Sequence, residues 1–497
     1  MKATDLGCRK GAITRFFVAL FCLILVVLLQ AGLAATPASL RLNAQLLGGT
    51  SSASHASRAS RFIVRDIAGL SGINLTCSLL GCQVLQSVGD PDGQLFVVQS
   101  SGLIDSALFL TQLLSAGGVI SAEPDQSGHT PPAATNVWPW YAYDRTLVSY
   151  FGVAVWEGYL IQTPNQIVRT AEAQSAFAVS GSGTTVALID TGVDPNNTIL
   201  APNLVYGYDF TRNTDGGSEM ADLTQSTVGV VDGSPAPLNS SSAGVIDQST
   251  VGVVDQSTVG VVDQSRYSAF GHGTMTAGIV HLVAPNASLM PLKAFSASGV
   301  GYESDVLRAV YYAVNHHAKI ISMSFEFASP SVELANAITY ATTKNVICVG
   351  SAGNSASMTV VFPSGLPNVI DTASTSNTNT PSSFSNYGTP PVWISAPGEA
   401  VLTTYPNQTY ALGWGTSFST PFVSGTVALM ASLNAANIDL LNQSTAAQSL
   451  SHAQPIPQIG YGFGVLDTYQ AVQAWQNFLS LNVTVSCSNL SCQTTIQ

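Results

Sequence analysis

The stretch Val186-Ala187-Leu188-Ile189-Asp190-Thr191-Gly192 decides the fold. Its apolar run predicts a buried strand over 185–189 that ends at a carboxylate and a turn through Gly192. Apolar runs of the same kind recur at 288–293, 319–323, 345–350 and 368–371. Such strands, alternating with helical segments, are typical of a parallel sheet covered on both faces. The sequence therefore predicts a doubly wound α/β domain over 166–477 with a mostly parallel sheet, and it places Asp190 at the sheet edge where such folds bind ligands.

Two further motifs carry reactive side chains. Residues 269–278 read Ala-Phe-Gly-His-Gly-Thr-Met-Thr-Ala-Gly, so glycines flank His272 and let a substrate approach the imidazole before a helix begins. Residues 414–421 read Trp-Gly-Thr-Ser-Phe-Ser-Thr-Pro and put Ser417 at the start of another helix, where backbone N–H groups can face a developing oxyanion. Taken singly, Asp190 and His272 are also typical of structural turns, and Ser417 of a helix cap.

In this order, the three segments resemble the active-site motifs of the subtilisin-like (subtilase) serine peptidases, and the likeness covers about residues 166–475. The resemblance implies a serine endopeptidase that cleaves polypeptides through an acyl-enzyme. Ser417 would attack the scissile carbonyl, and His272 would carry its proton. Asp190 would orient the imidazole and stabilise its charged form.

A fourth segment, Val349-Gly350-Ser351-Ala352-Gly353-Asn354, agrees with this resemblance. Asn354 matches the family's oxyanion-hole asparagine, although an Asn closing a turn fits the local sequence equally well. The stretch 322–326 resembles the strand that lines the primary specificity pocket, which implies Ser324 and Gly353 as substrate-binding residues. Glu326 and Val361 stand where many relatives have Gly, so the pocket is expected to be smaller, with an acid at its rim.

Residues 61–125 predict a separate small domain. Strand-like and helix-like segments follow one another there in the order β-α-β-β-α-β, which indicates a compact ferredoxin-like α+β unit. The unit ends at Glu123-Pro124-Asp125 and resembles the family's inhibitory propeptide, so we expect a precursor that processes itself and binds its own residues 61–125. Residues 36–60 are expected to be a linker and residues 126–165 a connector.

The first 35 residues have the pattern of a secretory signal peptide. Basic residues precede an apolar core from Phe16 to Leu29, and small residues follow at Ala34 and Ala35, where we expect cleavage. The protein would then be secreted, with no stable membrane insertion after the signal is removed. The alternative is an uncleaved anchor formed by residues 16–35.

Composition limits the partners and the compartment. Only 9% of residues are charged and the formal net charge is −12, so no basic surface for nucleic acid is expected. Two close cysteine pairs, Cys77 with Cys82 and Cys487 with Cys492, indicate two local disulfides in an oxidising compartment, and Cys348 indicates a buried thiol. The alternative is that all these cysteines are free.

An eight-residue repeat interrupts the main domain. Gln-Ser-Thr-Val-Gly-Val-Val-Asp occurs at 225–232, 248–255 and 256–263. Units this short form no core of their own, so residues 225–265 predict a surface insertion without chemistry, and a binding tract is the alternative. The insertion explains the long separation of Asp190 from His272. Residues 478–497 are expected to be a C-terminal tail.

No metal site and no required cofactor are expected. Relatives often bind structural calcium, but no run of alternating acidic residues supports such a site here. Two other functions use the same scaffold. One is a catalytically silent surface or adhesion protein, and the other is a peptidyl transferase or ligase that uses the same triad.

Overall fold

The computed structural model describes residues 59–127, 138–223, 250–253, 267–388, 392–433, 435–480, 483–488 and 491–496. The predicted signal peptide, nearly all of the linker 36–60 and most of the repeat insertion lie outside these residues. Among the helices of the described part, none is long and apolar enough to cross a membrane.

The small domain is a four-stranded antiparallel sheet with two helices on one face. Its elements are β1 (Arg61–Asp66), α2 (Gly69–Leu80), β2 (Cys82–Ser87), β3 (Leu95–Ser100), α3 (Ser106–Leu114) and β4 (Val119–Pro124), and the strand order is β2-β3-β1-β4. Alternate residues of β1 face opposite sides: Phe62 and Val64 pack under the helices, while Ile63 packs with the main domain. A disulfide joins Cys77 to Cys82, as the sequence predicts.

The main domain contains an eight-stranded sheet in the order β15-β14-β13-β12-β7-β11-β8-β9, parallel except at β9. Its strands are β7 (Thr185–Asp190), β8 (Tyr208–Asp209), β9 (Thr214–Asp215), β11 (Ser288–Lys293), β12 (Ile320–Met323), β13 (Ile347–Ser351), β14 (Ile370–Thr375) and β15 (Ile394–Pro397). Strand β11 lies on one side of β7 and β12 on the other, so the connection from β11 to β12 crosses over β7. The strand order therefore changes direction at the strand that ends in Asp190, and such a point favours a ligand site.

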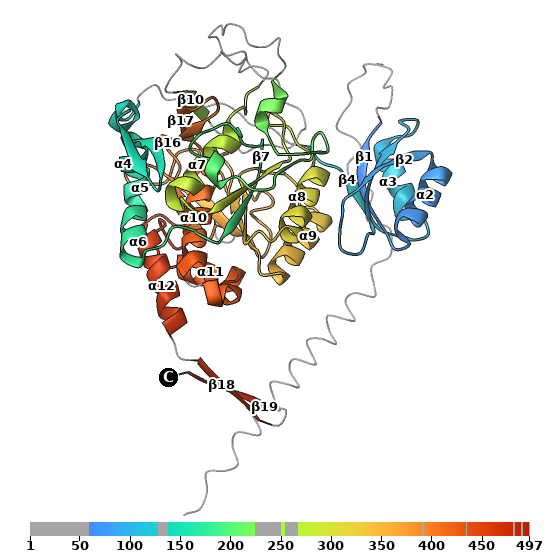
Figure 1. The fold of residues 1–497 in the computed structure, drawn as a ribbon. Helices are drawn as coiled ribbons and strands as arrows, with labels where there is room; N and C mark the ends of the chain where they lie inside the picture. Colours follow the sequence, from blue (N-terminus) through green and yellow to red (C-terminus); the bar gives the residue numbers. More distant parts are fainter. Residues whose placement is uncertain are drawn as a thin grey trace, which may run out of the picture. The chain divides into compact units, whose positions relative to one another are not determined.

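Helices cover both faces of this sheet. They are α7 (His272–Val283) and α10 (Thr416–Leu433) on one face, and α8 (Glu303–Asn315) and α9 (Val332–Thr343) on the other (Figure 1). Strand β7 is buried between the two helix layers. Val186 and Leu188 pack in the apolar cluster that contains α7 and α10, and Ala187 and Ile189 pack in the cluster that contains α8 and α9. The predicted doubly wound α/β fold is confirmed.

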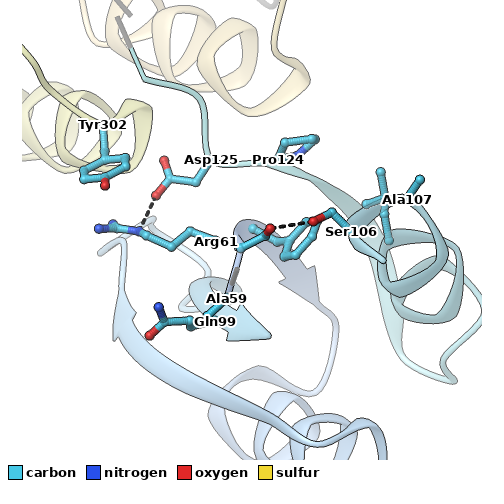
Figure 2. Close-up of a pocket in the computed structure, with 11 residues that line it drawn as sticks. Ala59, Arg61, Gln99, Ser106, Ala107, Pro124, Asp125 and Tyr302 are labelled. Atoms are coloured by element: carbon cyan, nitrogen blue, oxygen red, sulfur yellow. Dashed lines mark hydrogen bonds and ion pairs between the residues drawn. The ribbon is translucent and has the colours of Figure 1, made fainter. Parts of the chain in front are cut away.

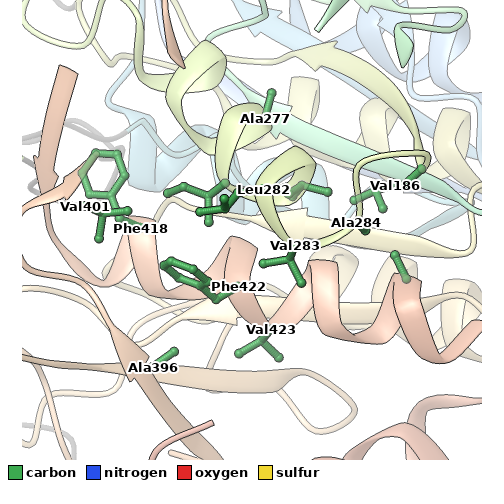
Figure 3. Packing of buried hydrophobic residues seen from close by; sticks show 14 of the residues in the cluster. Val186, Ala277, Leu282, Val283, Ala284, Ala396, Val401, Phe418, Phe422 and Val423 are labelled. Atoms are coloured by element: carbon green, nitrogen blue, oxygen red, sulfur yellow. The ribbon is translucent and has the colours of Figure 1, made fainter. Parts of the chain in front are cut away.

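Helices α7 and α10 pack closely against each other. Figure 3 shows Leu282 and Val283 of α7 beside Phe422 and Val423 of α10. Gly425 permits the approach, because a Cβ there would lie 2.6 Å from Cβ of Val283. Each helix begins at one of the predicted reactive side chains, so this packing fixes the two starting points relative to one another.

Residues 138–165 of the predicted connector form helices and a hairpin that pack into the main domain. They form η1 (Trp140–Tyr143), the hairpin β5 (Leu147–Tyr150) and β6 (Val153–Trp156), α4 (Glu157–Ile161) and the start of α5 (Thr163–Ile167). Tyr141, Val155 and Tyr159 are buried in the main apolar cluster. Aromatic side chains that bury this much area belong to the core of the main domain rather than to a spacer.

The remaining elements complete the main domain and the C-terminal part. They are α6 (Thr170–Phe177), η2 (Ala201–Asn203), η3 (Glu219–Asp222), β10 (Thr250–Val253), β16 (Val401–Tyr405), β17 (Thr409–Trp414), η4 (Ala435–Leu440), α11 (Gln443–Leu450), α12 (Thr468–Ser480), β18 (Val483–Ser488) and β19 (Ser491–Ile496). Of the predicted insertion 225–265, only β10 is described, and it pairs with β17 in a small antiparallel sheet. The expected tail contains the hairpin β18–β19, in which Cys487 lies opposite Cys492.

Candidate active site

The register of the main sheet brings the predicted site residues to one edge. Met323 of β12 lies beside Ile189 of β7 and beside Gly350 of β13. The residues that follow, Asp190 at the end of β7 and Ser324 directly after β12, therefore lie at the same level, on strands about 5 Å apart. Asn354 follows β13 by three residues and reaches the same edge.

Asp190 is buried and its carboxylate has several donors. Its Oδ1 accepts from the backbone N–H of Thr191 at 2.6 Å, and its Oδ2 accepts from the hydroxyl of Thr276 at 3.2 Å. These donors fix the carboxylate in one orientation and compensate its loss of hydration.

His272 is the first residue of α7, and its imidazole faces Asp190. The Nδ1 atom lies 2.8 Å from Oδ1 of Asp190, and both side chains are almost completely buried. Gly271, the N-cap residue, has φ +88° and lies against the ring of Tyr405, so a side chain at this position would be both strained and obstructed. Because Nδ1 faces the carboxylate, Nε2 is the ring nitrogen on the opposite side.

Ser417 lies in the first turn of α10, directly after the Gly415 turn that ends β17. Its hydroxyl donates to the carbonyl oxygen of Ser324 at 3.3 Å, and the Ser324 hydroxyl donates back to the carbonyl oxygen of Ser417 at 2.9 Å. The ring of the next residue, Phe418, is centred 5.6 Å from the His272 imidazole. The imidazole therefore lies beside the turn that carries Ser417.

The side chain of Asn354 is held in one orientation. Its Oδ1 accepts from the backbone N–H of Thr416 at 2.9 Å, which places its NH2 group, the donor that an oxyanion requires, on the other side of the amide. Gly353 has φ +98°, and a Cβ there would lie 2.6 Å from Oε2 of Glu326. Glu326, the acid that the sequence places at the rim of the expected pocket, is thus buried against Gly353.

Two buried charged residues beneath the site were not predicted. Glu219 of η3 accepts from the backbone N–H of Gly271, and Lys293 at the end of β11 donates to the carbonyl oxygen of Thr191 at 2.7 Å. Burial raises the pKa of Glu219 to about 8. A lysine inside an apolar strand was the one available signal for Lys293. Nothing in the sequence near Glu219 points to His272.

Within the described ranges, no three His, Cys, Asp or Glu side chains converge in a way that could hold a metal ion. Cys348 of β13 is buried with a free thiol, in agreement with the sequence prediction, and burial raises its pKa to about 12.

Comparison with known proteins identifies the family of this chain. The subtilase family profile matches residues 181–465. Thermitase of Thermoactinomyces vulgaris is 32% identical over 278 residues, which cover 54% of this chain and 82% of thermitase. A thermophilic serine proteinase of Bacillus sp. strain AK1 is 31% identical over 52% of this chain and 55% of its own length, and Subtilisin Savinase of Lederbergia lenta is 33% identical over 41% and 78%. The chain belongs to the subtilase family and is a serine-type endopeptidase.

Proposed function

We propose that Asp190, His272 and Ser417 form the catalytic triad of this peptidase. The observation that carries the proposal is the 2.8 Å contact between His272 Nδ1 and Asp190 Oδ1, beside the first turn of α10. In this arrangement Asp190 holds the imidazole, His272 takes the proton of the Ser417 hydroxyl through Nε2, and Ser417 attacks the peptide carbonyl. His272 then donates the proton to the leaving amine, and water hydrolyses the acyl-enzyme.

The NH2 group of Asn354 and the N-terminus of α10 are the proposed oxyanion donors. Both are fixed before a substrate arrives, because the Thr416 backbone N–H holds the other end of the Asn354 amide. Donors that need no reorganisation stabilise the charge that develops on the carbonyl oxygen. Ser324, which exchanges hydrogen bonds with Ser417, and Gly353, whose backbone N–H donates to the Thr416 hydroxyl, are the proposed substrate-binding residues.

The proposed precursor has residues 61–125 as an inhibitory domain. Figure 2 shows Arg61 of β1 between Asp125 and Tyr302. The Arg61 Nε lies 2.9 Å from Oδ2 of Asp125, and the guanidinium lies 3.9 Å from the centre of the Tyr302 ring. Asp125 also accepts from the backbone N–H and the hydroxyl of Ser304 at 3.0 and 2.9 Å. These contacts hold the end of the small domain at the start of α8.

A second contact joins the small domain to α9. Glu123 accepts from the hydroxyl of Ser331 and from the backbone N–H groups of Val332 and Glu333. Arg65 forms an ion pair with Glu333 at 2.7 Å. Together with the signal-like residues 1–35, these contacts support a secreted precursor that processes itself.

The test is hydrolysis of casein by purified protein, with and without a serine-directed phosphonate. Phosphonate-sensitive cleavage that disappears in Ser417→Ala is expected. Correctly folded protein without any cleavage would favour the silent surface protein. Transfer of acyl groups to added amines in preference to water would favour the ligase.

A further inference from the structure

Glu219 is a fully buried acid that touches the start of the helix carrying His272. Its Oε2 accepts from the backbone N–H of Gly271 at 2.8 Å, and its Oε1 accepts from the hydroxyl of Thr274. It therefore binds the residue before His272 and the residue two positions after it. No residue of the triad motifs provides these contacts.

Helix α7 depends on this outside acceptor for its cap. The N-cap residue Gly271 has no side chain, so the usual Ser, Thr, Asp or Asn oxygen is missing there. Glu219 supplies one oxygen, and the hydroxyl of Thr191 supplies another by accepting from the backbone N–H of Gly273 at 2.9 Å. A short side chain at position 271 could not replace them, because it would meet the ring of Tyr405.

Thr191 also connects Glu219 to the Asp190–His272 pair by hydrogen bonds. The Thr191 hydroxyl lies within 3.3 Å of both Oε2 of Glu219 and Oδ1 of Asp190. The backbone N–H of Thr191 donates to Asp190. Moving the start of α7 away from β7 would therefore break several buried hydrogen bonds together and leave buried polar groups unsatisfied.

The segment that carries Glu219 is itself held in place by charge. Asp222, at the end of η3, accepts from Lys293 Nζ at 2.7 Å and pairs with Arg212. The titratable groups that face Glu219 are Asp190, Lys293 and Tyr405. The Glu219 carboxyl accepts hydrogen bonds from Gly271, Thr274 and Thr191 and therefore has one defined position.

We propose that Glu219 is a positioning residue for the peptidase reaction, which holds the N-terminus of α7 so that His272 stays aligned between Asp190 and Ser417. The proposal rests on the proposed triad. Glu219 does not touch the reacting atoms and acts through His272. In sequence, Glu219 precedes the repeat insertion, which begins at Gln225.

The experiment compares Glu219→Ala and Glu219→Gln with wild type, after counting active sites by phosphonate titration. Glu219→Ala should lower kcat per titrated site by about 10- to 100-fold with KM nearly unchanged, because a small displacement of a catalytic group costs this much. Glu219→Gln keeps an oxygen for the Gly271 N–H and should recover most of kcat. Asp467→Ala is the matched control, since Asp467 is a buried carboxylate that caps α12 and pairs with Arg169.

The outcomes separate the two proposals. If kcat of Glu219→Ala matches that of Asp467→Ala and wild type, the positioning role is wrong. Should Glu219→Ala not fold, Glu219→Asp decides: its shorter side chain withdraws from Gly271, and an unchanged kcat would equally overturn the role. A wild type without phosphonate-sensitive hydrolysis would instead overturn the proposed triad.

Discussion

Carboxylates from distant parts of the chain bind the N-termini of α7, α8 and α9, and they differ in origin. Glu219, which binds the start of α7, comes from the main domain, whereas Asp125 and Glu123, at the starts of α8 and α9, come from the end of the small domain. Each places negative charge or an acceptor where the helix has unpaired N–H groups. Under the proposed processing, the contact at α7 is permanent and those at α8 and α9 are removable. The same type of contact, a carboxylate at a helix N-terminus, would thus serve both catalysis and inhibition.

The largest expected effect comes from removing the histidine that α7 carries. If the proposed triad is right, His272→Ala and Ser417→Ala should each lower kcat by at least about 1,000-fold, because triad members act as a unit. The double variant should lose little more than either single one. Casein hydrolysis per milligram of folded protein measures this, and near-normal cleavage by either single variant would rule out the assignment. In Ser417→Ala, the chain should also remain unprocessed.

The second expected effect is a lower free energy of unfolding when the buried Lys293 is replaced. Lys293 is completely buried, and its Nζ donates to Asp222 and to the carbonyl oxygens of Thr191 and Phe295. Lys293→Met would remove one of the two cations that pair with Asp222 and the donor to two buried carbonyl oxygens, which costs about 1 to 3 kcal/mol of unfolding free energy for each group left unsatisfied. Lys344→Met, at an exposed position, should change it by less than about 0.5 kcal/mol. Chemical denaturation of both variants measures the difference, and equal values would show that the buried pair contributes nothing.

A smaller effect concerns the removable contacts and pH. Burial and, to a smaller extent, the neighbouring carboxylates raise the pKa of Glu303, at the start of α8, to about 8. A carboxyl with a raised pKa favours the attached state fully below about 4.5 and loses this contribution as pH rises towards 8. Burial raises the pKa of Asp305 to about 6, with the same sign. The pKa of Glu333 is lowered, so its contribution changes only below its ordinary value of 4.5.

The small domain should therefore detach more readily at pH 8 than at pH 5. Hydrogen exchange of residues 61–125 in unprocessed Ser417→Ala measures this as faster exchange at the higher pH, after correction for intrinsic rates. Glu303→Gln should flatten most of the dependence. A flat profile in the parent Ser417→Ala protein would show that Glu303 does not sense the attachment of the domain.

The sequence predicted most strands of the main sheet, but not the buried residues Glu219 and Lys293 near the proposed site. Continuous apolar runs indicated β7, β11 and β12 nearly to the residue, because burial on both faces leaves a strong local pattern. The contacts of Glu219 and Lys293 depend on chain segments that meet only in the fold, so no local pattern marked them. The region 138–165 was underestimated for a related reason, since scattered aromatic residues reveal a core contact only once their neighbours are known.

The smallest expected effect concerns oxidation beside Ser417, the proposed nucleophile. Phe418 follows Ser417, is completely buried and has its ring 5.6 Å from that of His272. It cannot form a sulfoxide, and the buried sulfurs of Met275 and Cys348 are shielded from solvent. Burial raises the pKa of Cys348 to about 12, so almost none of its reactive thiolate is present at neutral pH.

Graded peroxide should therefore leave most activity of the native enzyme intact. Phe418→Met should become sensitive, because a sulfoxide would place a polar, bulkier group next to the site. Phe422→Met, one turn further along α10 in the packing against α7, is the matched control and should stay resistant. Hydrolysis after each peroxide step measures the three proteins side by side. Equal, rapid inactivation of all three would show that the residue after Ser417 does not set the sensitivity, and it would direct attention to Met275 on α7.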